Sequence, residues 1–122
     1  MQTLYFENAW ERTIAQDDRD YIIEKFEEVK LELEEGIHFT FLWAAENHKK
    51  DLLITALIHN VRSYPLLLDD TVIAYQTNTD TPYINKFYIK ETIPAHSTMP
   101  WTFIFSENKP TYETPKYVIV AQ

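Results

Sequence analysis

Apolar and polar side chains alternate immediately after Gly36, the only glycine in the chain. A two-residue period is typical of a β-strand, because successive side chains of a strand point to opposite faces of its sheet. The alternation places the apolar residues on one face: Ile37, Phe39, Phe41, Trp43 and Ala45. The pattern therefore predicts a strand with one buried face.

Further short segments with strand character follow at regular spacing. A polar turn over residues 47–51 leads into Leu52–Asn60, so the first two strands should form a hairpin. The later segments are residues 66–68, 71–76, 86–90, 101–105 and 117–120. About seven short strands at this spacing predict a mainly β fold, which we expect to be an antiparallel β-sandwich over about residues 36–121.

One amphipathic helix precedes the strands. Ile22, Phe26 and Val29 recur at helical spacing and form an apolar stripe, while charged side chains face away from it. The pattern predicts a helix over about residues 17–31, with Asp17 or Asp18 as its N-cap. Because the strand at 52–60 is apolar on both faces, the helix could cover one of them.

Size and composition restrict the function classes. A chain of 122 residues without a repeat or a linker fits one domain. The net charge of −8 disfavours a nucleic-acid partner. A single glycine excludes Gly-rich phosphate loops, and the absence of cysteine excludes disulfides and thiol catalysis. No signal peptide or membrane-spanning run is visible, which predicts a cytoplasmic protein, with peripheral membrane attachment left open.

Three segments together resemble the SLAP domain, a bacterial family named for S-layer assembly proteins of accessory Sec systems. Residues 93–105 (IPAHSTMPWTFIF) are similar to its signature, and residues 53–60 (LITALIHN) to a preceding strand. The third segment joins residues 66–69 to residues 72–74. Order and spacing agree over about residues 8–106. Asp70 and Met99 stand where the family usually has a glycine and an arginine.

The resemblance implies an immunoglobulin-like domain with an N-terminal helix and without catalytic activity. It also implies a link to the export or assembly of surface-layer proteins. We interpret the matching positions as structural, with the large aromatic side chains in the core. These positions are Thr55, Asn60, Asp69, Pro94, Pro100, Trp101, Thr102, Phe103 and Phe105.

The acidic helix is the candidate partner surface. Asp20, Glu24, Glu27 and Glu28 fall on its polar side and could present negative charge to a basic protein. The alternative interpretation is a solvated face that keeps the protein soluble. The preceding residues Leu4–Phe6 and Trp10 either contact a partner or add an edge strand and pack on the core.

No motif for catalysis, metal binding or a cofactor is present. The histidines lack metal-site spacing. His38 and His59 could face each other across the hairpin, which leaves open a metal site or a pH switch. The alternative is that they are outward-facing polar residues or hydrogen-bonded strand residues.

We therefore predict a non-enzymatic protein-interaction domain. Its partner would be another protein, such as secretion machinery or an S-layer protein, and strand edges could also support a homodimer. The alternative is a carbohydrate- or cell-wall-binding module that uses exposed aromatic rings. Solvent exposure of Trp10, Trp43 or Trp101 would distinguish the two functions.

Overall fold

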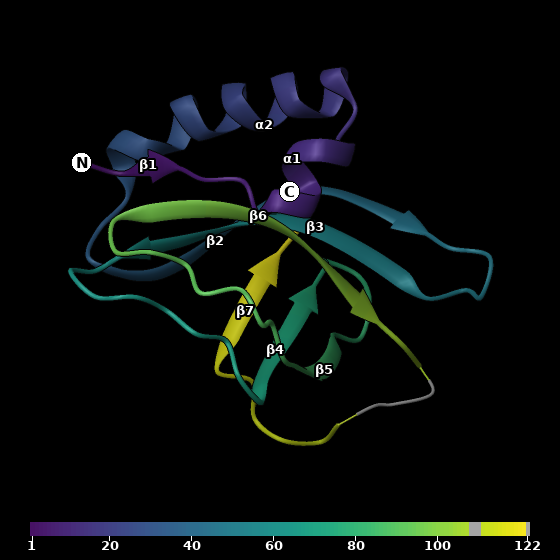
Figure 1. The fold of residues 1–122 in the computed structure, drawn as a ribbon. Coiled ribbons are helices and arrows are strands. Elements are labelled where there is room, and N and C mark those ends of the chain that lie inside the picture. The colour runs from purple at the N-terminus through teal and green to yellow at the C-terminus, as the bar shows by residue number, and fades with distance from the viewer. Residues whose placement is uncertain (108–110, 122) are drawn as a thin grey trace.

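Two β-sheets face each other, and a helix lies across the outer side of the larger sheet (Figure 1). The computed structural model describes residues 1–107 and 111–121. The larger sheet has the order β1 (Thr3–Leu4), β6 (Ser97–Phe105), β3 (Leu52–Val61) and β2 (Gly36–Glu46). The smaller sheet has the order β5 (Tyr83–Phe87), β4 (Thr71–Gln76) and β7 (Tyr117–Val120). The prediction of a mainly β, two-sheet fold is confirmed.

Both sheets contain parallel as well as antiparallel pairs. The pairs β2–β3, β3–β6 and β4–β5 are antiparallel. β1 pairs with β6 in parallel, and β7 pairs with β4 in parallel. The prediction of a purely antiparallel sandwich is wrong for these two pairs, because strands joined by long connections need not reverse direction as hairpin strands do. The strand order does not confirm an immunoglobulin-like topology.

The seventh strand differs from the expected one. Leu66 forms only an isolated bridge with Ile93, although Leu66 and Leu68 are buried in the core. Thr3–Leu4 instead supplies an edge strand, which confirms the interpretation that this segment joins the sheet. The strand expected at 86–90 lies at Tyr83–Phe87.

A β-bulge changes the direction of Trp43. The register of β2 against β3 shifts between Phe41, which pairs with Ala56, and Trp43, which pairs with Thr55. Leu42 is the additional residue at this point, and it is buried on the helix side of the sheet. Because one extra residue reverses the alternation, Trp43 also packs on the helix side. The prediction that Trp43 shares a face with Phe39 and Phe41 is therefore wrong.

The main core lies between the sheets and is rich in aromatic rings. Phe103 and Phe105 are at most 1% exposed. The ring of Phe87 packs against both in T-shaped contacts, with centroid distances of 5.2 and 5.0 Å. Edge-to-face packing of this kind adds to the stabilisation from burial.

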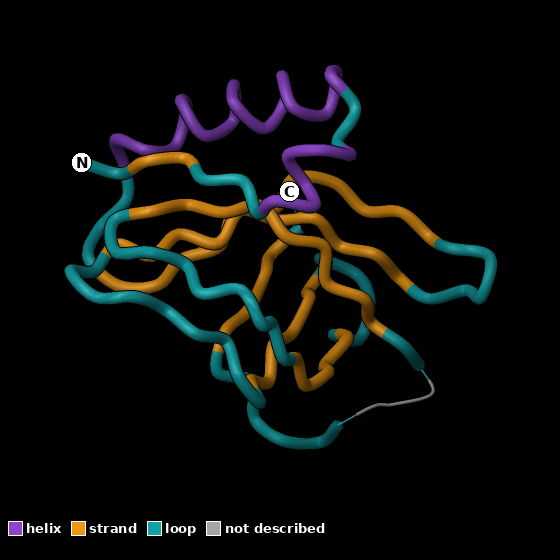
Figure 2. Tube along the Cα trace, viewed as in Figure 1, coloured by secondary structure: helices purple, strands orange, loops and turns teal. Residues whose placement is uncertain are grey.

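A second apolar cluster attaches the helix to the larger sheet. Helix α2 (Gln16–Val29) continues as the 3₁₀ turn η1 (Lys30–Glu32), which confirms the helix expected at about 17–31. Ile22 and Phe26 of α2 pack against Leu42 and Leu57 of the sheet. Figure 2 shows α2 and the short helix α1 (Asn8–Thr13) on this one side of the strands. Among the described residues, no helix is both long and apolar enough to cross a membrane.

The N-terminus of α2 differs from the predicted cap. Ala15 occupies the N-cap position and makes no side-chain hydrogen bond there. Asp17 and Asp18 lie in the first turn of the helix, two and three residues beyond the cap. The prediction of an aspartate N-cap is wrong because the helix begins earlier than expected. The two carboxylates instead favour the helix through its dipole, which is positive at this end.

Candidate functional site

The aromatic residues of the Pro-Trp-Thr-Phe segment belong mainly to the core. Phe103 and Phe105 are buried between the sheets, as predicted. Trp101 pairs in register with Ala56 and packs against the same core, but it is only half-buried. Pro100 is buried and pairs with Leu57 on the opposite, helix-covered face. These rings therefore support the fold and do not form an exposed platform.

Asn60 joins three segments of the chain. Its side chain is fully buried at the end of β3. The Nδ2 group donates to the carbonyl oxygens of Tyr64 (2.9 Å), Ile93 (3.1 Å) and Pro94 (3.0 Å). The Oδ1 atom accepts a hydrogen bond from Nε of Arg62 at 2.9 Å. These bonds tie the end of β3 to the loops at Tyr64 and at Ile93–Pro94, where the Ile93 carbonyl also accepts the backbone N–H of Leu66, and they support the structural interpretation of Asn60 and Pro94.

The turn after residue 68 has an unusual backbone conformation. Asp69 is exposed, and its carbonyl oxygen accepts a hydrogen bond from the hydroxyl of Thr71 at 3.1 Å. Asp70 has a φ of 52°. This left-handed conformation costs little for glycine and is tolerated by aspartate better than by most residues. Lys86 lies 3.6 Å from the Asp70 carboxylate.

A buried histidine lies between two threonine hydroxyls. His59 is fully buried on the helix side of β3. Its Nε2 and Nδ1 atoms each form a hydrogen bond of 2.7 Å, with Oγ1 of Thr40 and Oγ1 of Thr98 respectively. Burial, with a smaller contribution from nearby His38, lowers the pKa of His59 from its usual 6.5 to about 4. The imidazole is therefore neutral at pH 7.

His38 and His59 face each other in register, as the sequence predicted. They have separate partners, however, because Nε2 of His38 contacts the carbonyl oxygen of Glu34 at 2.9 Å. In the described part of the chain, no group of three metal-ligating side chains comes together. The pair is accounted for as hydrogen-bonded strand residues.

The acidic residues proposed to contact a partner are all exposed on α2. Asp20 accepts a hydrogen bond from Gln16 at 2.8 Å. Glu27 pairs with Lys30, and Glu28 lies 3.6 Å from Lys25. Glu24 has no ionic partner among residues 1–107 and 111–121. The four carboxylates therefore share one solvent-facing side, where two are partly neutralised.

A hollow of about 590 Å³ opens beside the two helices. We call it the helix hollow, and it is formed by α1, the start of α2 and the outer face of the larger sheet. Its lining residues are Glu7, Ala9, Trp10, Thr13, Ile14, Ala15, Asp18, Trp43, Thr55 and Thr102. The sequence indicated Trp10 and Trp43 as aromatic candidates, but nothing in it placed them in one hollow with Thr55 and Thr102.

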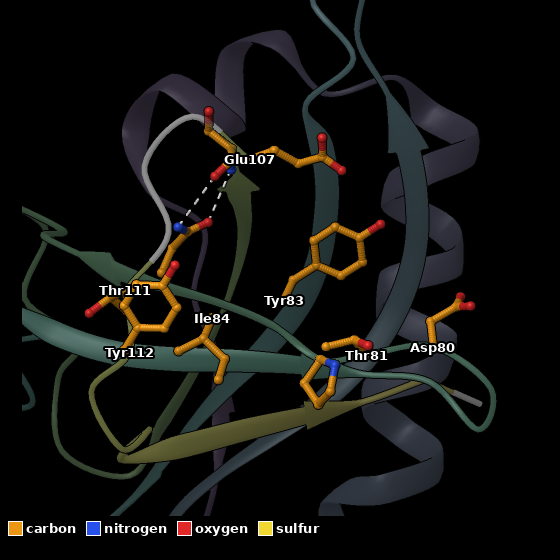
Figure 3. A pocket seen from close by; sticks show the side chains of 10 residues that line it. Asp80, Thr81, Tyr83, Ile84, Glu107, Thr111 and Tyr112 are labelled. Atoms are coloured by element: carbon orange, nitrogen blue, oxygen red, sulfur yellow. Dashed lines mark hydrogen bonds between the residues drawn. The ribbon is translucent and has the colours of Figure 1, made fainter.

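A second hollow, of about 530 Å³, lies beside β5 (Figure 3). Tyr83 and Tyr112 belong to its lining together with the carboxylates Asp80 and Glu107. Asn85 accepts a hydrogen bond from the backbone N–H of Ser106 at 3.0 Å, which ties β5 to the end of β6. Residues 108–110 lie outside the described residues, and we assign no site to this hollow.

Comparison with known proteins gives one family. Residues 4–117 match the family model described as the SLAP domain, which belongs to accessory Sec systems. The match covers nearly the whole chain, including both helices and all strands except parts of β1 and β7. No curated protein and no solved structure gives a significant match.

Proposed function

The chain belongs to the SLAP-domain family, and on this premise we propose that it is a non-enzymatic protein-interaction domain. Its partner would be a component of the secretion machinery or an S-layer protein. We place the protein in the cytoplasm, with peripheral membrane attachment as an open alternative. Within this proposal the two sheets are a variant of the immunoglobulin-like arrangement.

The acidic side of α2 is the observation that carries the proposal. Residues 16–32 contain seven acidic and three basic side chains. Because Ile22 and Phe26 attach the helix to the sheet, Asp20 and Glu24 face outward on a rigid element. A fixed negative surface accelerates association with a basic partner. The ion pairs within the helix are exposed and contribute little, so a partner can replace them at low cost.

The titratable side chain with the most strongly perturbed pKa among the described residues, His59, supports a non-enzymatic role. His59 is 0% exposed, and both of its ring nitrogens are hydrogen-bonded to threonine hydroxyls. A general base has to reach the proton that it removes from the substrate. An imidazole in this position stabilises the sheet and has no access to a substrate.

The experiment that tests the acidic side is a crosslinked pull-down from the source cells with the purified chain as bait. The variant Glu24→Lys/Glu27→Lys/Glu28→Lys reverses the charge of this surface. A matched control, Asp69→Lys/Asp80→Lys/Glu107→Lys, makes the same charge change at exposed positions elsewhere. Circular dichroism checks that both variants are folded.

We expect the helix variant to lose specific partners that the control variant and the original chain retain. The charge reversal would replace attraction by repulsion for a basic protein. If the helix variant captures the same proteins as the original chain, the acidic side of α2 is not the interaction surface.

The second candidate function is carbohydrate or cell-wall binding. The half-buried Trp10 and Trp43 in the helix hollow favour it, since indole rings are large amphipathic contact surfaces. Trp101 does not favour this function, because its ring packs on the core between the sheets. Sedimentation with purified peptidoglycan tests this candidate. Binding that is lost in Trp10→Ala would support it, and no sedimentation of the original chain would exclude it.

A further inference from the structure

The helix hollow combines aromatic walls with a polar floor. Trp10 comes from α1, and Trp43 comes from the bulge of β2. The ring of Tyr21 lies 6.0 Å from that of Trp43 and is tilted by 52°, so Trp43 is supported from the side of α2. Indole rings attract cations to their faces, and the attraction increases where water is partly excluded.

The floor of the hollow is a pair of hydroxyl groups. Thr55 and Thr102 are register partners on β3 and β6, and their Oγ1 atoms are 2.8 Å apart. Thr55 is only 2% exposed. One hydrogen bond between two hydroxyls uses one hydrogen and one lone pair, so further lone pairs remain to accept a bond from a ligand. The two hydroxyl groups can therefore accept hydrogen bonds from the N–H groups of a ligand.

The lining of the hollow carries negative charge. Glu7 and Asp18 contribute carboxylates, and no basic side chain is among the lining residues. Glu7 accepts the backbone N–H of Ala9, whereas Asp18 has no hydrogen bond or ion pair within the described residues. Arg19, which follows Asp18 in the sequence, pairs with other groups. Its Nη1 atom lies 3.1 Å from a carboxylate oxygen of Glu11, and its guanidinium lies 4.6 Å from the centroid of the Phe6 ring.

We propose that the helix hollow binds the guanidinium group of an arginine on a partner protein. A guanidinium is planar, carries five N–H donors and stacks on aromatic rings, which matches two indoles, two hydroxyls and two carboxylates. Ammonium groups lack the planar face that would lie against Trp10 and Trp43. The proposal rests on the proposed function in one respect, that the partner is a protein.

The three tryptophans make the site directly measurable. Trp10 and Trp43 line the hollow, while Trp101 packs on the core between the sheets and acts as an internal reference. The probe is N-acetyl-L-arginine amide, titrated into the ¹⁵N-labelled chain while the indole N–H signals are followed by NMR. The matched neutral probe is N-acetyl-L-citrulline amide, which has nearly the same shape without the charge.

We expect the arginine probe to shift the signals of Trp10 and Trp43 in a saturable way and to leave Trp101 unchanged. The citrulline probe should have at least about tenfold weaker effect, because it lacks the charge that the carboxylates attract. Equal shifts with both probes, no saturable shift, or an equal shift at Trp101 would overturn the proposal. Saturable shifts with N-acetylglucosamine alone would do so too and would assign the hollow to a sugar.

A pair of variants tests whether the carboxylate of Asp18 binds the arginine probe. Asp18→Asn should weaken binding of the arginine probe about fivefold or more. Asp17→Asn makes the same change one residue earlier, at an exposed position outside the hollow, and should leave binding unchanged. Equal loss in both variants would show only a general charge effect and would contradict the proposed site. These results are independent of the Lys variants of α2, so the acidic-side proposal and the arginine site can fail separately.

Discussion

Acidification should weaken the folded state through His59. In the folded protein, burial lowers the pKa of His59 from its usual 6.5 to about 4, while the unfolded chain keeps the usual value. As the pH falls through 6.5, the unfolded state therefore takes up a proton that the folded state does not. The free energy of unfolding must then decrease with falling pH, and the decrease is complete below about pH 4.

The magnitude follows from the two pKa values. Each tenfold difference in proton affinity corresponds to about 1.4 kcal/mol, so a pKa lowered from 6.5 to about 4 corresponds to about 3 kcal/mol in total. This amount is a large share of the stability of an ordinary domain. Protonation would also reverse one of the two 2.7 Å contacts with Thr40 and Thr98, because the ring nitrogen that accepts from a threonine hydroxyl in the neutral imidazole would then donate to it.

The assay is urea unfolding of the original chain and of His59→Gln at several pH values between 7 and 4.5. The stability of the original chain should fall more steeply than that of His59→Gln, by about 1 kcal/mol per pH unit near pH 5. His48→Gln removes an exposed histidine and should keep the slope of the original chain. Equal slopes for the original chain and His59→Gln would refute the argument, as would an NMR titration of His59 near pH 6.5.

Three further substitutions test the structural roles of single residues. Asn60→Ala should lower the free energy of unfolding by about 2 kcal/mol, because it removes the buried amide that bonds the carbonyls of Tyr64 and Pro94 and the side chain of Arg62; a loss below 1 kcal/mol in urea unfolding would contradict this role. Ile22→Ala should cost about 3 kcal/mol and increase acrylamide quenching of Trp43, since α2 loses its central contact. Asp70→Gly should be about 1 kcal/mol more stable than Asp70→Ala, because both lose the contact with Lys86 but only glycine adopts a φ of 52° freely; equal melting temperatures would count against this.

Local patterns in the sequence were sufficient for most of the fold. The two-residue period identified the strands around Phe39 and Phe103, because one face of each strand is buried between the sheets. The helical spacing of Ile22 and Phe26 identified α2 because the same two side chains attach it to the larger sheet. In each case the apolar side chains that form the sequence pattern are the same side chains that pack in the fold.

Features that depend on distant contacts could not be predicted. The bulge at Leu42 adds one residue without any local mark in the sequence, and it moves Trp43 to the opposite face. The helix hollow requires Trp10, Trp43 and Thr102 from three elements, so no spacing along the chain indicates it. The acidic residues on α2 were visible in the sequence, and their role as a partner surface remains a prediction.

The parallel pairing of the two end strands has a consequence for synthesis on the ribosome. Thr3–Leu4 pairs with residues that are made more than ninety positions later, and β4 receives β7 only when residues 117–120 have emerged. A nascent chain can therefore form the β2–β3 hairpin early but keeps an unpaired strand edge on each sheet until β6 and β7 have been made. During that interval the unpaired backbone groups of β4 and the aromatic side chains of the incomplete core between the sheets are available to a chaperone or to another nascent chain.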